Sequence, residues 1–324
     1  MKRYKIAIDT KGCDKGASVI VSGACLALKQ SPELEVLLVG DSAEILSLCQ
    51  ENEADMSRVE ILEAPDVITN YDNPSVAIFA KYNSSLVKAL EAVGKREDLH
   101  GLLNAGSTGA LLTGSMRFLS GKNRVRPALC AVLPSENGGF TCLVDTGATI
   151  DCTPEMLHHF AKIGTDFMKK MYALDNPRVG LLSNGAEETK GNALVKATHQ
   201  LLKNDGELNF IGNLEGNNAL SGKCDVLVCD GFAGNQVLKV TEGTAKRVIT
   251  DIVKYARKMG KPELMEVVQY LMATYDIASL GGGIVLGVEK PVIKAHGACD
   301  EKAIVSTVKM LLNMAQNKEI FDKK

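Results

Sequence analysis

Short apolar runs alternate with helix-like stretches along almost all of the 324 residues, and this alternation constrains the possible folds more than any other feature. In the first half, the strand-like runs are residues 4–9, 34–40, 58–63 and 99–104. Helical spacing of apolar residues lies between them, for example at 17–30 and 74–93. Because parallel strands need such crossover helices, the alternation predicts a largely parallel sheet covered by helices.

The second half adds an antiparallel element to this pattern. Strand-like runs at 127–134 and 140–145 flank the polar turn 135–139, which is typical of a β-hairpin. The later strand-like runs are 178–183, 208–212, 225–230, 285–288 and 292–294. The helices predicted around them are 154–172, 189–203, 236–255 and 300–316. The sheet is therefore expected to be mixed.

Charge, aromatic content and cysteine spacing exclude several classes of protein. Lys and Arg number 37 and Asp and Glu 39, so the net charge of -2 gives no bulk attraction to nucleic acid. Trp is absent and aromatic residues make up 5%, too few for a base-stacking surface, so we expect no nucleic-acid partner. The nine cysteines form no Cys-x-x-Cys pair, which argues against a zinc site and a disulfide framework.

The location is predicted from what the sequence lacks. The first residues do not resemble a secretory signal, and no apolar stretch approaches the roughly 18 residues that a membrane-spanning helix needs. Most cysteines lie inside apolar runs, as Cys130 and Cys229 do. We therefore expect a cytoplasmic protein whose cysteines are small buried hydrophobic residues.

Glycine-rich or polar loops follow four of the predicted strands. They are 104–109, 183–187, 212–216 and 230–235. Strand ends in an open α/β sheet face one crevice, where glycines let a ligand approach the backbone and helix N-termini offer N–H groups to an anion. The loops together indicate a site for a phosphate-bearing ligand. No Walker sequence occurs and no Gly-x-Gly-x-x-Gly opens the first strand–helix unit, which argues against nucleotide hydrolysis and a standard dinucleotide site.

Three side chains are candidates for acid–base or cationic roles. His296 follows a predicted strand at the edge where the site is expected. Lys190 lies where a helix is predicted to begin, and its alternative interpretation is a solvated lysine paired with Glu187. Lys239, one turn into a predicted helix, can point back at the loop before it. No nucleophile elbow or Cys–His pairing indicates a covalent intermediate.

No cofactor and no metal are predicted. No cluster of His, Asp and Glu has the spacing of metal ligands. Isolated Asp9, Asp145 and Asp230 leave a divalent ion as an open alternative.

The segment 117–126 carries four cations and no acid. They are Arg117, Lys122, Arg124 and Arg126. In a chain of net charge -2 this local asymmetry would attract an acidic partner or a phosphate. The alternative interpretation is a solvated loop.

A broad apolar stripe is predicted on a helix near residue 270. Its members are Leu264, Val267, Val268, Leu271 and Tyr275, widened by Met265 and Met272. Four cations precede it, namely Lys254, Arg257, Lys258 and Lys261. Two interpretations stay open: the stripe packs across a dimer interface, or the tip with Leu264 and Met265 also touches an anionic membrane weakly.

An ordered set of motifs runs along nearly the whole chain. They are 104–110, 126–128, 145–148, 190–192, 210–216, 225–235 and 294–297. Together they resemble the PlsX-type phosphate acyltransferases of fatty acid and phospholipid synthesis, and Asp-Gly-Phe-x-Gly-Asn followed by Lys-x-His-Gly is quite specific. Two departures occur: the second glycine of the family's first loop is Cys13 here, and an amide after the strand 178–183 is displaced by one position, to Asn184.

The resemblance implies a three-layer α/β/α sandwich with a mixed, mostly parallel sheet and a helical dimerisation protrusion, similar to the phosphotransacetylase and isocitrate dehydrogenase folds. Residues 1–324 would form a single unit, with 236–280 as the helical subregion for dimerisation and membrane contact. The implied reaction converts acyl-[acyl-carrier protein] and inorganic phosphate into acyl phosphate and free carrier protein, which feeds phospholipid synthesis. The implied partners are the acyl-carrier protein, phosphate, a second copy in a homodimer and a weakly bound membrane surface.

The resemblance also implies which residues belong to the site, and we assign their roles from the chemistry. Lys190, Asn235 and His296 are the predicted catalytic residues. Backbone N–H groups of 107–108 and 234–235, with Lys190, would hold phosphate, Asn235 would stabilise the oxyanion, and His296 would protonate the leaving thiolate. The cations of 117–126 would bind the acidic carrier. The predicted substrate- and phosphate-binding residues are Asp9, Asn104, Gly106, Ser107, Thr108, Asn184, Glu187, Asn192, Asn213, Glu215, Asp230, Gly231, Gly234 and Lys239.

Other functions stay open at this point. One is a phosphotransacetylase-like enzyme acting on short acyl-CoA. Another is a non-catalytic scaffold that binds the carrier or a membrane, for which the altered first loop is the sequence hint. A dehydrogenase rests on fold analogy alone.

Overall fold

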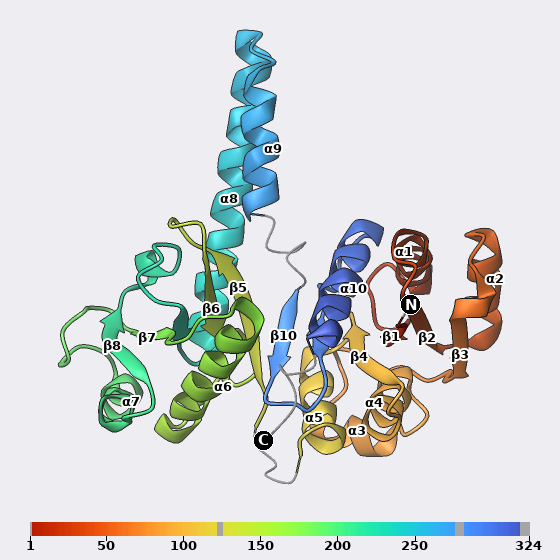
Figure 1. Cartoon of the computed structure of the whole chain (residues 1–324), viewed down its shortest axis with the longest axis horizontal. Coiled ribbons are helices and arrows are strands. Elements are labelled where there is room, and N and C mark those ends of the chain that lie inside the picture. The colour runs from red at the N-terminus through yellow and green to blue at the C-terminus, as the bar shows by residue number, and fades with distance from the viewer. Residues whose placement is uncertain (1, 122–125, 276–281, 318–324) are drawn as a thin grey trace. The chain divides into compact units, whose positions relative to one another are not determined.

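The computed structural model describes residues 2–121, 126–275 and 282–317, and its contacts divide the chain into two compact units (Figure 1). Unit 1 comprises Met1–Ala128 and Ala278–Lys324, and unit 2 comprises Leu129–Ile277. Each of these units has its own strands and its own covering helices.

The described part of unit 1 contains six strands in the order β3-β2-β1-β4-β11-β10. They are β1 (Tyr4–Asp9), β2 (Leu34–Gly40), β3 (Val59–Glu63), β4 (Leu99–Asn104), β10 (Gly283–Leu286) and β11 (Val292–Lys294). Neighbours are parallel except for β10 and β11, which are antiparallel. Side chains of the central strands, such as Ile6 and Leu38, are fully buried, which is why these strands read as apolar runs in the sequence.

Helices cover both faces of this sheet (Figure 1). One layer holds α1 (Ala17–Gln30), α2 (Ser42–Glu51) and α10 (Glu301–Gln316), and the other holds α3 (Pro74–Ala80), α4 (Ser85–Lys95) and α5 (Thr108–Phe118). The single helix predicted over 74–93 is two helices. The helix is interrupted there because the Ser84 hydroxyl accepts a hydrogen bond from the Val87 N–H and so caps a new helix.

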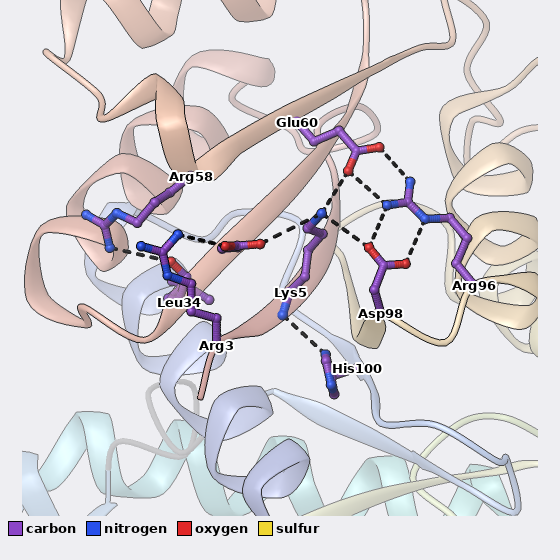
Figure 2. Close-up of polar contacts among 9 residues, drawn as sticks. Arg3, Lys5, Leu34, Arg58, Glu60, Arg96, Asp98 and His100 are labelled. Atoms are coloured by element: carbon purple, nitrogen blue, oxygen red, sulfur yellow. Dashed lines mark hydrogen bonds and ion pairs between the residues drawn. The ribbon is translucent and has the colours of Figure 1, made fainter. Parts of the chain in front are cut away.

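An ion-pair network joins the amino-terminal ends of the parallel strands of unit 1 (Figure 2). Lys5 Nζ on β1 lies 3.0 Å from Glu60 Oε2 on β3 and 3.2 Å from Asp98 Oδ2, just before β4. Arg96 binds both Glu60 oxygens, at 2.6 and 2.9 Å, and its hydrogen bonds lower the pKa of Glu60 to about 2. The network thus lies at the amino ends of the strands. Ligands of open α/β sheets bind at the opposite, carboxyl ends.

Unit 2 has the strand order β5-β6-β9-β7-β8 among its described residues. The strands are β5 (Ala128–Pro134), β6 (Phe140–Val144), β7 (Arg178–Leu182), β8 (Asn209–Leu214) and β9 (Val226–Val228). Strands β5 and β6 form the predicted antiparallel hairpin, and the other neighbours are parallel. The prediction of an α/β fold with a mixed, mostly parallel sheet is confirmed.

Three helices pack on the strands of unit 2, and two of them begin at other residues than predicted. Helices α6 (Pro154–Tyr172) and α7 (Ala193–Asn204) pack against each other, and the first turns of α8 (Gly231–Met259) pack on the core around Leu143 and Leu227. Helix α7 begins four residues later than predicted, because Asn192 caps it. Helix α8 begins five residues earlier, because the Asp230 carboxylate accepts the Ala233 N–H at 2.8 Å.

Helix α9 (Leu264–Tyr275) returns along the distal part of α8, and the pair extends away from the strands of unit 2 (Figure 1). Of the predicted apolar stripe, Val268 is buried, whereas Val267 and Met272 are 45% and 53% exposed. The stripe is thus only partly covered within the described residues: Leu264, Leu271 and Tyr275 are half-buried, and Met265 is exposed as well. Residues 276–280 of the predicted helical subregion lie outside the described residues. Across the parts that the structure describes, no helix is both long and apolar enough to cross a membrane.

Candidate functional site

The predicted site residues fall into two groups, one in each unit. Unit 1 holds Asp9, Asn104, Gly106, Ser107, Thr108, Arg117, Arg126 and His296. Unit 2 holds Asn184, Glu187, Lys190, Asn192, Asn213, Glu215, Asp230, Gly231, Gly234, Asn235 and Lys239. The predicted carrier-binding residues Lys122 and Arg124 lie outside the described residues.

In unit 1, a buried carboxylate organises the carboxyl ends of two neighbouring strands. Asp9 ends β1 and Asn104 ends β4, and Asn104 Nδ2 donates to Asp9 Oδ2 at 2.7 Å. The other Asp9 oxygen accepts the Lys11 N–H, and Asn104 Oδ1 accepts the Gly106 N–H at 3.1 Å. These bonds fix the loop after each strand. Asp9 and Asn104 therefore act by positioning backbone, with their polar atoms already engaged.

The altered first loop keeps its close backbone approach. Gly12 has φ +85°, and a Cβ there would lie 2.8 Å from the Gly106 Cα, so this glycine is needed. Cys13, at the position of the family's second glycine, is buried and faces Gly297 O at 3.2 Å and Cys299 Sγ at 4.0 Å. The cysteine thus fills space beneath the loop after β11 and leaves the contact between Gly12 and Gly106 intact.

His296 is exposed at the end of β11, in a loop attached to these strand ends. The Ala295 N–H donates to Asn104 O at 2.8 Å, and the Asp14 N–H donates to Gly297 O at 2.9 Å. His296 Nδ1 accepts the Ala298 N–H at 3.2 Å, so the neutral ring carries its proton on Nε2, the nitrogen that is left to donate.

Helix α5 begins at Thr108 directly after these loops. Its N-cap residue Ser107 is buried but makes no side-chain capping bond. The first N–H groups of a helix have no intrahelical acceptor, so this end of α5 can donate to an anion. At the other end of α5, Arg117 is exposed, donates to Ile78 O at 3.2 Å and lies 4.2 Å from the centre of the Phe79 ring.

In unit 2, the fully buried carboxylate of Asp145 joins the hairpin to the start of α8. It accepts the N–H groups of Leu129, Ala148 and Thr149 at 2.9, 3.1 and 2.6 Å. Burial raises the pKa of Asp145, and these hydrogen bonds oppose that shift. The sequence showed Asp145 as part of a motif but not that its carboxylate is saturated by backbone donors.

The first turn of α8 packs closely against this loop, which corrects the predicted role of its backbone. A Cβ on Gly234 would collide with Asp145 O, and one on Gly231 would lie 2.7 Å from Thr149 O. The Gly231 N–H donates to Thr149 O and the Gly234 N–H to Asp230 O. The backbone of Gly234 and Asn235 is therefore helical and is not a free loop that could cradle phosphate. These glycines serve close packing.

A cavity of about 430 Å³ lies between the ends of β7 and β9 and the starts of α7 and α8. It is lined by Leu157, Leu182, Ser183, Asn184, Gly191, Asn192, Val195, Cys229, Asp230 and Ala233. Three of these, Asn184, Asn192 and Asp230, are predicted site residues. Ser183 and Gly191 lie in segments that the sequence singled out, 183–187 and 190–192, but were not named as site residues. The apolar lining residues were missed because apolar side chains give no signal of a ligand in a sequence.

The loop that carries Lys190 is built by hydrogen bonds around this cavity. Asn184 Oδ1 accepts the Gly191 N–H at 2.8 Å, and the Lys190 N–H donates to Glu187 O at 3.0 Å. Asn213 is buried and donates to the same Glu187 carbonyl at 2.9 Å, so it is a positioning residue. The Lys190 ammonium is exposed and has no ion-pair partner among the residues that the structure describes, Glu187 included.

Lys239, Glu215 and Asn235 are not among the residues that line the cavity. Lys239 does not point back at the Asp230 loop; it pairs with Glu242 at 2.7 Å, further along α8. Glu215 is exposed and directly precedes a short 3-10 turn. Asn235 lies beside Gly147: its Cβ is 4.0 Å from the position that a Cβ on Gly147 would occupy. Among the described residues, no group of three or more His, Cys, Asp or Glu side chains is arranged to hold a metal ion.

Solved structures share this fold. The phosphotransacetylase from Streptococcus pyogenes gives a TM-score of 0.64 at 16% identity, over 97% of this chain and 94% of that one. The 4-hydroxythreonine-4-phosphate dehydrogenase from Klebsiella pneumoniae gives 0.55 at 12% identity, over 98% and 99%. At these identities the likeness shows the fold alone. The fold belongs to the α/β class.

Sequence comparison defines the family. The family model described as "Fatty acid synthesis protein" matches residues 4–321. A phosphate acyltransferase from Caldanaerobacter subterraneus is 40% identical over 320 residues, which cover 97% of this chain and 94% of that protein. One from Clostridium perfringens is 39% identical over 319 residues with the same coverage. The chain therefore belongs to the fatty acid synthesis protein family, and the resemblance inferred from its motifs is confirmed.

The protonation of Asp9 gives a testable pH dependence. Burial raises its pKa to about 6, against the hydrogen bonds from Ser85, Lys11 and Asn104. An aspartate in the unfolded chain has a pKa of about 3.9, so between these values the folded state binds more protons. The free energy of unfolding should therefore fall as pH rises from about 4 to 6, by up to about 3 kcal/mol from this group.

Urea unfolding of wild type and Asp9→Asn between pH 4 and pH 7 measures this contribution. The wild type should lose stability across the window relative to the variant, whose side chain does not titrate. Asp175→Asn, at an exposed position, is the control and should retain the wild-type slope. Parallel curves for wild type and Asp9→Asn would contradict the assignment.

Proposed function

We propose that the chain transfers the acyl group of an acyl-[acyl-carrier protein] thioester to inorganic phosphate. A phosphate oxygen attacks the thioester carbonyl carbon, the C–S bond breaks, and acyl phosphate and free carrier thiol leave. The observation that carries the proposal is the identity of about 40% with proteins named phosphate acyltransferase along nearly the whole chain. The product would be consumed in phospholipid synthesis.

Phosphate near neutral pH is already nucleophilic, so the protein has to position it and offset its charge more than activate it. The start of α5, with buried Ser107 and Thr108 at its first turn, supplies N–H groups suited to an anion. Lys190 supplies an exposed positive charge with no ion pair to another described residue. We assign both to phosphate.

His296 and Asn235 are assigned to the thioester. The Nε2–H of neutral His296 can donate a hydrogen bond to the departing thiolate and stabilise its charge, since Nδ1 is held by the Ala298 N–H. With its backbone inside α8, Asn235 would stabilise the oxyanion through its side-chain amide rather than its main chain.

Two other functions remain testable. A phosphotransacetylase-like enzyme would use short acyl-CoA, and it shares the fold at 16% identity. An assay of acyl phosphate formation with a panel of acyl-carrier and CoA thioesters separates the two by kcat/KM. A non-catalytic scaffold would bind the carrier without any phosphate-dependent turnover.

The two exposed candidates can be tested by truncation. Lys190→Ala and His296→Ala should each lower kcat by about 10²-fold or more, because each removes a group that stabilises developing charge. Melting temperatures should stay near that of the wild type, since both side chains are exposed. Lys196→Ala, an exposed lysine on α7, is the matched control and should retain activity. Near-full activity of both variants would refute the assignment.

The cationic segment is proposed to receive the acidic carrier. Arg117 is exposed, donates to a carbonyl and lies over aromatic rings, and Arg126 is also exposed. Arg117→Glu/Arg126→Glu should raise KM for the acyl-carrier thioester at low salt, and the difference should shrink at high salt, where exposed charges are screened. KM for phosphate should not change. If the KM for the acyl-carrier thioester is unchanged at low salt, the segment does not bind the carrier and is a solvated loop.

The pair of α8 and α9 is proposed to form a homodimer and to touch a membrane at its tip. Support comes from exposed apolar residues such as Val248, Tyr270 and Met272, which a second copy would cover. The cations near Gly260, including Arg257 and Lys258, are exposed and suit anionic headgroups.

Leu264→Glu/Met265→Glu tests both parts of this proposal. The variant should lose co-sedimentation with anionic liposomes, because two acids replace the apolar tip, and it should remain dimeric in sedimentation velocity. Equal liposome binding, or none by the wild type, would remove the membrane contact. A monomeric variant would show that these two residues belong to the dimer interface instead.

A further inference from the structure

The cavity of unit 2 is poorly suited to phosphate. Its lining contains no Lys, Arg or His, and its one acidic group is Asp230. A phosphate dianion there would face a carboxylate in a partly dry site without a compensating cation. At about 430 Å³ the cavity also has the size of small-molecule sites, which is far more than a phosphate ion fills.

The polar atoms of the cavity suit a neutral ligand with amide groups. Ser183 Oγ is buried and has no hydrogen-bond partner among the described residues. Asn184 and Asn192 each use Oδ1 to accept a backbone N–H, at 2.8 and 2.9 Å, which leaves their amino groups as donors. Asp230 uses Oδ1 on the Ala233 N–H and retains Oδ2 as an acceptor.

Apolar side chains form the remainder of the wall. Leu157, Leu182, Val195 and Ala233 come from four different elements, α6, β7, α7 and α8. The ligand should therefore be elongated and mainly aliphatic, with amide carbonyls that accept from the asparagines and an amide N–H or hydroxyl that donates to Ser183 or Asp230.

We propose that this cavity holds the pantetheine arm of the thioester substrate, and that phosphate is not bound there. Pantetheine is a flexible aliphatic chain with two amides and a gem-dimethyl group, and it is uncharged between its phosphate and its thiol. The inference rests on the proposed function for its thioester. It reassigns Asn184, Asn192 and Asp230 from phosphate to the arm. Because carrier proteins and CoA share this arm, the cavity should bind the arm of either molecule and not distinguish between them.

Two variants test the cavity in different ways. Ala233→Leu fills it, and Asn184→Asp replaces a donor by a carboxylate while keeping the oxygen that holds Gly191. Both should raise KM for the acyl-carrier thioester by about tenfold or more and leave KM for phosphate within about twofold. The matched controls are Ala197→Leu, exposed on α7, and Asn217→Asp, exposed on a 3-10 turn, and both should behave as the wild type.

Direct binding separates this inference from the proposed function. Calorimetric titration with reduced pantetheine, and in parallel with CoA and with inorganic phosphate, needs no turnover. The wild type should bind pantetheine and CoA, and both variants should weaken that binding by about tenfold or more without altering phosphate binding. If the wild type makes no acyl phosphate but this pattern holds, the proposed function fails and the cavity assignment stands.

Three results would overturn the inference. The first is a wild type that does not bind pantetheine. The second is a rise in KM for phosphate in Asn184→Asp with an unchanged thioester KM, which would identify a phosphate site. The third is pantetheine affinity that is unchanged in Asn184→Asp, an isosteric replacement at an exposed position that does not threaten the fold.

Discussion

The buried carboxylate of Asp145 is the contact on which the site region of unit 2 depends. Its three backbone N–H bonds fix the loop after β6, and the carbonyl of the same residue lies where any side chain on Gly234 would collide. Helix α8 can therefore begin directly after β9, with Asp230 as its cap. That early start brings Ala233 to the wall of the cavity and turns a predicted ligand loop into a packed helical turn.

In unit 1, opposite ends of the parallel strands carry different chemistry. At the amino ends, Lys5 and Arg96 pair with Glu60 and Asp98 in a partly exposed network, where opposite charges offset each other and water still reaches them. At the carboxyl ends, Asp9 is buried, binds amide and N–H donors and retains a proton to higher pH. The charged side chains thus lie at the amino ends of the strands, where water reaches them. At the carboxyl ends near His296, hydrogen bonds to Asp9 and Asn104 fix the loops.

The two units differ in what their strand ends offer a ligand. The start of α5 in unit 1 presents N–H groups without a side-chain cap, which favours an anion. The starts of α7 and α8 in unit 2 are both capped by side chains, and the cavity beside them combines apolar walls with uncharged polar groups and one carboxylate, without a cation in its lining. Helix N-termini therefore do not all indicate phosphate sites. A capping side chain uses the donors that the sequence pattern would assign to a ligand.

The sequence by itself determined the fold class, the hairpin, most strands and the family, because buried parallel strands and loop motifs are local features. It could not place the helix starts at Ser84, Asn192 and Asp230. A side chain caps a helix only where its oxygen lies within hydrogen-bond distance of a free backbone N–H, and the sequence does not show where that geometry is met. Only the tertiary structure decided that Lys239 pairs with Glu242, that Asn213 positions a loop, and that apolar Leu157 and Val195 line a cavity. The role of Asn213 and the lining of the cavity depend on contacts between residues distant in the chain, for which no local pattern exists. The Lys239–Glu242 pair is local, at i and i+3 on α8, but the sequence did not decide between it and a contact with the preceding loop.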